Sequence, residues 1–271
     1  MSAPVLQYEK RDHIAYITFN RPERRNAMNP EMICRLADAW EDFNTDDDMR
    51  VALVTGAGTE AFTAGADLKT MIPLLSGARE PEDEWDFRLL ADDQKVSHAA
   101  TLKNSTIYKP IVAAINGPCL GAGSELLQAI DIRIAGEQAS FAVNEVALGF
   151  MPGGGSAVRL ARQIPYCMAM QFLLVADKVG AEDAHRMGFI NEVVPVDEVL
   201  ARAQWYAERI AANGPLAVRK TKETVLRTLG LSWEEAYEVE AENCVITMNS
   251  EDAKEGPLAF AEKRMPRFTG K

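Results

Sequence analysis

The sequence predicts an α/β protein with parallel strands, followed by a helical C-terminal region. Short apolar stretches that end in glycine recur along the 271-residue chain, at residues 49–58, 109–118 and 131–136. Such stretches are typical of buried parallel strands, and helical patterns alternate with them. Beyond Pro195 the pattern becomes almost wholly helical. We therefore expect a core over residues 1–195 and a helical region over residues 196–271.

The N-terminal elements carry clear boundary signals. Residues 13–19 have the composition of a strand, which Asn20 ends. A helix should follow over residues 29–44, because Asn29 is a favoured N-cap and Pro30 suits the first helical position.

The glycine turn after the next strand matches the G-x-G-x-x-A pattern of a dinucleotide-binding turn, with Gly56, Gly58 and Ala61. It does not follow the first strand, and Gly65 interrupts the helix that a dinucleotide fold needs. The sequence contains no Tyr-x-x-x-Lys pair, so a short-chain dehydrogenase would lack its base. We therefore expect no dinucleotide cofactor.

The formal net charge of -11 narrows the classes of partner. An acidic surface repels nucleic acid and anionic membranes, so we expect neither as a partner. A phosphate-bearing ligand would need a local basic patch or backbone amides.

Cysteines and histidines are dispersed along the chain. The four cysteines form no CxxC pair, which predicts reduced thiols in the core of a cytoplasmic protein: Cys34, Cys119, Cys167 and Cys244. The N-terminus has no pattern of a secretory signal, and no stretch resembles a membrane span. No metal site is expected, because the histidines are scattered at His13, His98 and His185.

Two glycine-rich turns could each offer a free backbone amide; they are residues 61–71 and 117–130. In the first turn, Gly65 permits a tight bend and Asp67 can favour the start of a helix, which leaves the amide of Ala66 free. In the second, a helix that begins at residues 126–130 puts the amide of Ala122 near its positive end. Two such donors aimed at one oxygen would form an oxyanion hole.

Glu125 and Glu145 are each the single charged residue of an apolar stretch. Taken alone, Glu125 could simply favour the dipole at a helix N-terminus. Two isolated glutamates also fit a second interpretation, in which burial and mutual repulsion raise a pKa for acid/base chemistry. The residues alone leave both interpretations open.

The sequence resembles the crotonase (enoyl-CoA hydratase/isomerase) superfamily over nearly its whole length. The matching motifs, in order, are residues 19–29, 61–71, 114–135, 141–162, 188–195 and 250–270. The resemblance implies a ClpP/crotonase-like α/β spiral of ββα units with a C-terminal helical trimerisation region. It also implies a homotrimer or a dimer of trimers.

The resemblance also implies a site for an acyl-CoA thioester. The amides of Ala66 and Ala122 would hold the thioester oxygen, although the family usually has glycine at position 122. Glu125 and Glu145 align with the two acid/base glutamates of hydratases, which favours hydration of a 2-enoyl-CoA or the reverse dehydration. No cofactor is implied, because coenzyme A is part of the substrate.

Eight further residues match positions that bind CoA in the family: Arg24, Arg25, Ala27, Ala64, Asp67, Leu68, Phe260 and Lys263. The resemblance places the two arginines near the adenine and phosphates, and Phe260 and Lys263 at the CoA of a neighbouring subunit. The alternatives are a basic surface turn and a residue that packs at a helix end.

Other functions remain open at this stage. An enoyl-CoA isomerase needs a single base, a carnitinyl-CoA dehydratase-like enzyme uses the same pair, and a relative that only binds CoA or RNA would not catalyse. Residues 70–105 should shape the acyl pocket, and residues 77–97 form either a solvated loop and helix start or a lid. Trp85 and Phe87 either line the pocket or pack within that segment.

Overall fold

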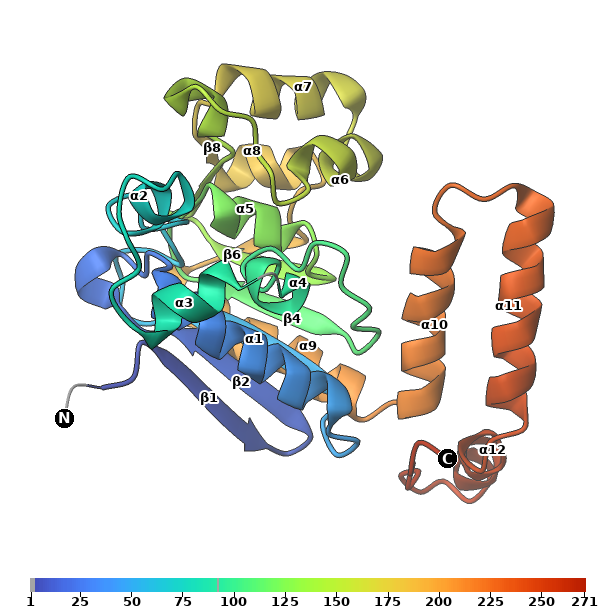
Figure 1. The fold of residues 1–271 in the computed structure, drawn as a ribbon. Coiled ribbons are helices and arrows are strands. Elements are labelled where there is room, and N and C mark those ends of the chain that lie inside the picture. Colours follow the sequence, from blue (N-terminus) through green and yellow to red (C-terminus); the bar gives the residue numbers. More distant parts are fainter. Residues whose placement is uncertain (1–2, 92) are drawn as a thin grey trace.

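The computed structural model describes residues 3–91 and 93–271 and contains two sheets (Figure 1). The larger sheet has the order β1-β2-β3-β4-β6-β9, and the smaller has β5-β7-β8. The strands are β1 (Leu6–Arg11), β2 (Ile14–Phe19), β3 (Val51–Gly56), β4 (Ile111–Ile115), β5 (Cys119–Leu120), β6 (Ile132–Gly136), β7 (Ser140–Ala142), β8 (Val179–Gly180) and β9 (Glu192–Val194). From β2 to β9 all neighbours in the larger sheet are parallel, as the sequence predicts.

Helices cover both faces of the larger sheet, so its strands are buried on both sides. Alternate residues of β3 face two cores: Val54 packs in the core that contains α1 (Pro30–Thr45), and Leu53 in the one that contains α9 (Val199–Ala211). The side chain of Asn29 accepts a hydrogen bond from the amide of Met32, which confirms the predicted N-cap.

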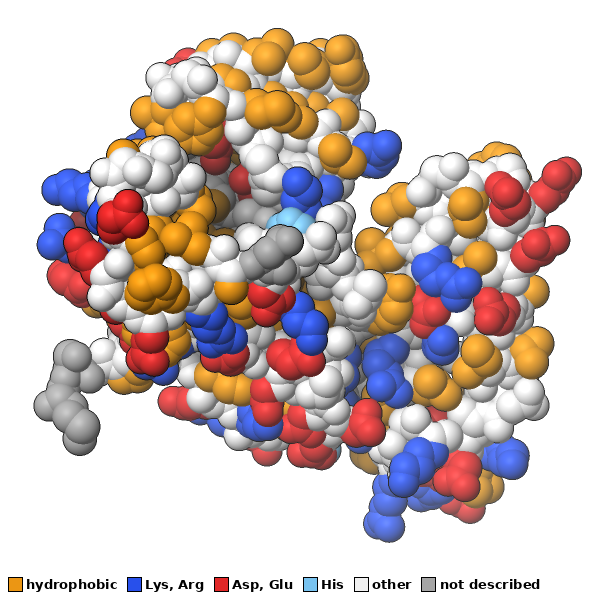
Figure 2. Space-filling view, in the orientation of Figure 1, with side chains coloured by type: hydrophobic (Ala, Val, Ile, Leu, Met, Phe, Trp, Pro, Cys, Tyr) orange, Lys and Arg blue, Asp and Glu red, His pale blue; other side chains and the backbone are white. Residues whose placement is uncertain are grey.

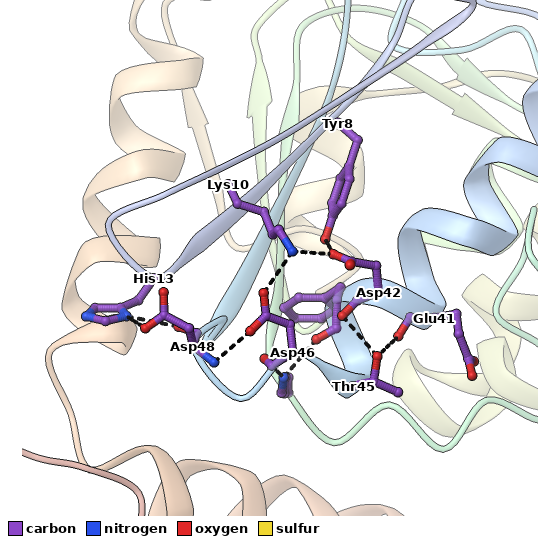
Figure 3. A network of polar contacts seen from close by, with 10 residues as sticks. Tyr8, Lys10, His13, Glu41, Asp42, Thr45, Asp46 and Asp48 are labelled. Atoms are coloured by element: carbon purple, nitrogen blue, oxygen red, sulfur yellow. Dashed lines mark hydrogen bonds and ion pairs between the residues drawn. The ribbon is translucent and has the colours of Figure 1, made fainter.

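A cluster of ionic side chains joins the β1–β2 hairpin to the end of α1 (Figure 3). We call it the hairpin cluster; its members are Tyr8, Lys10, His13, Asp42, Asp46 and Asp48. The ammonium of Lys10 lies 2.8 Å from a carboxylate oxygen of Asp42 and 2.8 Å from one of Asp46. The Tyr8 hydroxyl donates to Asp42 at 2.7 Å. Because carboxylates near a helix C-terminus oppose its dipole, the Lys10 cation stabilises this end of α1.

The segment before β4 forms three short helices, α2 (Met71–Leu75), α3 (Glu84–Leu90) and α4 (Gln94–Ser97). Ion pairs of Arg88 with Asp38 and of Lys95 with Glu41 attach α3 and α4 to α1. This attachment favours the loop-and-helix interpretation of residues 77–97 over a lid.

The two aromatic residues of α3 have different surroundings. Trp85 is half-buried against the core, with the guanidinium of Arg35 4.9 Å from its ring centroid. Phe87 is 60% exposed. Trp85 therefore packs on its own layer, while Phe87 is open to solvent.

The remaining helices follow the sheet in chain order. They are η1 (Pro22–Arg24), α5 (Ala122–Leu127), η2 (Glu145–Leu148), α6 (Ser156–Gln163), α7 (Tyr166–Val175), α8 (Ala181–Arg186), η3 (Val196–Glu198), α10 (Pro215–Thr228), α11 (Trp233–Met248) and α12 (Asp252–Ala261). Helices α10–α12 project away from the sheet (Figure 1). The boundary at residue 195 stays a prediction, and the packing of α9 on the sheet favours a boundary after α9.

Two expectations about local structure are wrong. Helix α5 begins at Ala122, not at residues 126–130, because Gly121 has a φ of +52° and turns the chain directly into the helix. Only Cys34 and Cys119 are core thiols, since Cys167 and Cys244 lie on the exposed faces of α7 and α11. Among the described residues no helix has the length and apolar content to cross a membrane.

Candidate active site

The two glycine-rich turns lie side by side, joined by backbone pairing. The amide of Leu120 donates to the carbonyl of Thr63 at 3.0 Å, which ties the first turn to β5. On its other side, the amide of Met28 donates to the carbonyl of Gly65 at 2.8 Å. The first turn is therefore held between two strands of backbone.

Gly65 allows the two turns to approach each other. Its φ is +85°, and a Cβ there would lie 2.6 Å from the Leu120 carbonyl oxygen and 3.3 Å from the Ala122 nitrogen. Neither the Ala66 amide nor the Ala122 amide donates a hydrogen bond to a described residue. Two free donors from distant parts of the sequence are thus close together.

Glu125 lies on α5, three residues after Ala122, and is 4% exposed. Its Oε1 accepts hydrogen bonds from the amides of Gly154 (2.9 Å) and Ser156 (3.2 Å). Burial raises the pKa of this carboxyl, while those hydrogen bonds and the nearby Arg159 guanidinium oppose the rise.

Glu145 begins η2 and is also buried. Burial raises its pKa to about 7, and the charge of Glu125 adds to the rise. Its Oε2 has no hydrogen-bond partner among the described residues. A Cβ on Gly121 would lie 3.3 Å from Glu145 Oε1, so this carboxylate borders the second turn. Two buried carboxylates and two free amides therefore share one site.

The structure brings the N-terminal basic turn to the same place. The amide of Ala64 donates to the carbonyl of Arg25 at 2.9 Å, which attaches residues 22–28 to the first glycine-rich turn. The side chains of Arg24 and Arg25 are exposed and form no ion pair with a described residue. They are free to meet an anionic ligand.

The other proposed CoA contacts divide into two groups. Ala27, Ala64 and Leu68 lie beside the first turn, and the carboxylate of Asp67 is already paired with Arg21 at 3.0 Å. By contrast, α12 lies at the opposite end of the molecule from α2 and α5 (Figure 1). Within one chain, Phe260 and Lys263 therefore do not reach the site.

Apolar side chains surround the approach to these turns. Figure 2 shows them gathered over α2 and α3 beside a hollow in the surface. Those exposed there are Leu68, Ile72, Leu75, Phe87 and Leu90. This rim has the character that an acyl chain would favour.

Reasoning from sequence missed the groups that hold Glu125. A Cβ on Gly154 would lie 2.5 Å from Glu125 Oε2, so only glycine permits the carboxylate to sit there. Ser156 opens α6, whose N-terminal amides point at the carboxylate. The run of three glycines before α6, residues 153–155, is the signal that could have indicated an anion at this helix start.

The Gly56 turn has a structural role. A Cβ on Gly56 would lie 2.4 Å from the Phe62 carbonyl oxygen, and no helix begins between β3 and Met71. The turn therefore lacks the helix that a dinucleotide-binding turn requires. Among the described residues no group of three or more His, Cys, Asp or Glu side chains could hold a metal ion.

Comparisons with known proteins agree on one family. A family model described as "Enoyl-CoA hydratase/isomerase" matches residues 9–271. The enoyl-CoA hydratase EchA19 of Mycobacterium tuberculosis is 40% identical over 267 residues, 98% of this chain and 97% of that protein. The carnitinyl-CoA dehydratase of Proteus mirabilis is 35% identical over 270 residues, 98% of each chain.

A solved structure shows the same architecture. The crystal structure of an enoyl-CoA hydratase from Mycobacterium tuberculosis H37Rv superposes with a TM-score of 0.87 at 36% identity, covering 99% of this chain and 100% of that one. This likeness confirms the expected crotonase-like fold.

Proposed function

Because the chain is an enzyme that belongs to the enoyl-CoA hydratase/isomerase family, we propose that it adds water to a 2-enoyl-CoA or catalyses the reverse dehydration. The observation that carries the proposal is the pair of buried carboxylates, Glu125 and Glu145, beside the free amides of Ala66 and Ala122. An isomerase needs one base, so the presence of two buried carboxylates favours hydration.

The two amides would act on the thioester oxygen. When the oxygen of water bonds to C3, the electrons of the double bond move toward the carbonyl and negative charge grows on its oxygen. Donors fixed in place before the reaction stabilise that charge, and losing one typically costs about 3 kcal/mol. The positive end of the α5 dipole adds to their effect.

The surroundings of the two carboxylates suggest their roles. Glu125 has two amide donors and a guanidinium nearby, which favour its ionised form, so it would take the proton of the attacking water. Glu145 has a pKa of about 7 and an unpartnered oxygen, so it would carry the proton delivered to C2. In dehydration the two roles reverse. No cofactor beyond the CoA of the substrate takes part.

Binding of CoA would rely on local charge. Arg24 and Arg25 are exposed cations next to the first turn, and they suit the CoA phosphates in an otherwise acidic protein. Ala27, Ala64, Asp67 and Leu68 would border the rest of that ligand. The apolar rim over α2 and α3 would meet the acyl chain.

We also expect a homotrimer or a dimer of trimers in the cytoplasm. Large apolar side chains are exposed on the projecting helices, among them Trp233 (77%) and Phe260 (86%). Apolar surface of this kind is typical of an interface. In such an assembly, Phe260 and Lys263 would contact the CoA of a neighbouring subunit. Light scattering after gel filtration tests this expectation, and a monomer at assay concentration would contradict it.

The function is tested by following the ultraviolet absorbance of crotonyl-CoA and of a longer 2-enoyl-CoA. We expect the conjugated thioester signal to fall with wild type and to persist with Glu125→Gln or Glu145→Gln. Glu137→Gln is the matched control, because Glu137 is an exposed glutamate outside the site. Full activity in either site variant would refute the acid/base assignment.

A further inference from the structure

Gln128 and Ser156 lie in a buried hydrogen-bonded chain that ends at Glu125. We infer that this chain positions the Glu125 carboxylate and keeps it ionised for catalysis. The inference rests on the proposed role of Glu125 as the base. Neither Gln128 nor Ser156 needs to touch substrate, so both are positioning residues.

The chain connects two helices. Gln128 follows the last residue of α5, and Ser156 is the first residue of α6. Gln128 is 3% exposed and Ser156 fully buried. The side-chain nitrogen Nε2 of Gln128 lies 2.7 Å from Ser156 Oγ and 3.2 Å from the carbonyl oxygen of Ser124.

These contacts fix the direction of each hydrogen bond. The carbonyl of Ser124 can only accept, so the atom of Gln128 that faces it must be the NH₂ group. The same NH₂ group therefore donates to Ser156 Oγ, and the serine keeps its own hydrogen for another acceptor. That acceptor is the Glu125 carboxylate, to which the Ser156 side chain hydrogen-bonds.

Glu125 consequently receives donors from one helix start. The amides of Gly154 and Ser156 donate to Oε1, and the hydroxyl of Ser156 adds a third hydrogen bond. Each of these favours the carboxylate over the neutral acid, against the effect of burial. The hydroxyl is the one donor whose direction depends on another side chain, and that side chain is Gln128.

Folding alone does not account for an amide at position 128. The Oε1 atom of Gln128 is shielded from solvent and has no partner among the described residues, which destabilises the folded state. An unbranched apolar side chain such as methionine has similar length and carries no such cost. Unfavourable buried polar groups of this kind are found where function requires them.

The test compares Ser156→Ala and Gln128→Met with wild type across a pH series. Ser156→Ala keeps the backbone amide and removes the hydroxyl. We expect kcat to fall about tenfold and the acid limb of kcat/KM to move to higher pH, because Glu125 becomes harder to ionise. Gln128→Met leaves the hydroxyl in place but free to rotate, so the same shift should be smaller, about threefold in kcat. KM should not change in either variant.

Two further variants separate positioning from mere packing. In Ser156→Ala/Gln128→Met the loss should equal that of Ser156→Ala alone, since Gln128 acts only through the hydroxyl. Gln128→Glu should shift the acid limb further than Gln128→Met, because a carboxylate there accepts the serine hydrogen and turns it away from Glu125. Gln204→Met on α9 is the control, and it should behave as wild type.

The outcomes distinguish this inference from the proposed function. If Glu125→Gln is inactive while Ser156→Ala and Gln128→Met keep the wild-type kcat and pH profile, the positioning role is wrong and the base assignment stands. If the two losses add and follow the melting temperature, the residues are structural and the inference is overturned. Activity in Glu125→Gln would overturn both proposals.

Discussion

The hairpin cluster and the candidate active site both gather carboxylates, yet they stabilise them in opposite ways. In the hairpin cluster, Asp42 and Asp46 share the ammonium of Lys10, and the side chains are partly exposed. In the site, Glu125 and Glu145 are buried, and no lysine or arginine forms an ion pair with either. One region neutralises its charges with a cation, and the other leaves them to backbone amides or to nothing.

The pKa values follow this difference. Hydrogen bonds from Lys10 lower the pKa of Asp42 and of Asp46, whereas burial raises the pKa of Glu125 and takes that of Glu145 to about 7. A carboxyl group paired with a cation stays ionised and does not exchange protons near neutral pH. A buried one without a cation can do so. Pairing thus distinguishes carboxylates that hold the fold from those suited to proton transfer.

The largest expected effect comes from neutralising one carboxyl in each region. Glu145→Gln should lower the hydration rate about a thousandfold, because the group that transfers a proton is lost. Asp42→Asn should leave the rate unchanged, since its carboxylate only stabilises α1 and the hairpin. Initial rates with a 2-enoyl-CoA measure both. Equal losses in the two variants would show that the comparison has no functional content.

The next effect concerns the backbone that replaces a cation at Glu125. Gly154→Ala places a methyl group 2.5 Å from Glu125 Oε2 and 2.4 Å from Thr101 Cγ2, so the carboxylate must move. A displacement of this size should lower kcat about a hundredfold. The adjacent Gly153→Ala meets nothing within 4 Å and should keep the wild-type rate. If both glycine variants are fully active, the position of Glu125 does not depend on this loop.

A smaller effect should separate free cations from paired ones. Arg24→Ala should raise KM for the acyl-CoA about threefold at low salt, with kcat unchanged, because an exposed contact to a phosphate is lost. The difference from wild type should shrink as salt is added. Lys10→Ala removes a cation that is already paired, so its KM should equal that of wild type. A salt-independent KM in wild type and Arg24→Ala alike would contradict a phosphate contact.

The smallest effects concern stability, and the two regions should differ in sign. Glu145 has a folded pKa of about 7 against an ordinary value of 4.5, so the free energy of unfolding falls as pH rises through this interval. Asp42 has a lowered pKa, so its contribution is present above the ordinary value of 3.8 and is lost as pH falls through the lowered one.

Urea denaturation at about pH 5 and about pH 8 measures this difference. Glu145→Gln should be more stable than wild type at the higher pH and nearly equal to it at the lower one. Asp42→Asn should be slightly less stable than wild type at both. An advantage of Glu145→Gln that does not depend on pH would mean that the carboxyl is not titrating in the folded protein.

The sequence alone predicted the features that depend on neighbouring residues. The parallel strands, the N-cap at Asn29 and the two glycine turns each depend on short patterns, and the structure contains all of them. The isolation of Glu125 and Glu145 in apolar stretches also indicated their burial. Hydrophobic period and glycine chemistry act locally, so they can be recognised in one chain.

What could not be predicted depends on residues far apart in the chain. The amides that hold Glu125 lie 29 and 31 residues away, and the partner of Asp67 is Arg21, 46 residues away. The start of α5 at Ala122 was also missed, because glycine and serine are poor helix formers and the surrounding fold overrides that preference. Likewise, composition alone does not reveal which cysteines lie on exposed helix faces.

The free amides of Ala66 and Ala122 have a consequence for how this protein can vary during evolution. A backbone N–H is present whichever residue occupies the position, proline excepted. The side chains at 66 and 122 can therefore drift while the donors persist. The mutational risk falls instead on Gly65, which has no reactive group, because any side chain there would push the two donors apart. In this site the least reactive residue is the one that selection can least afford to change.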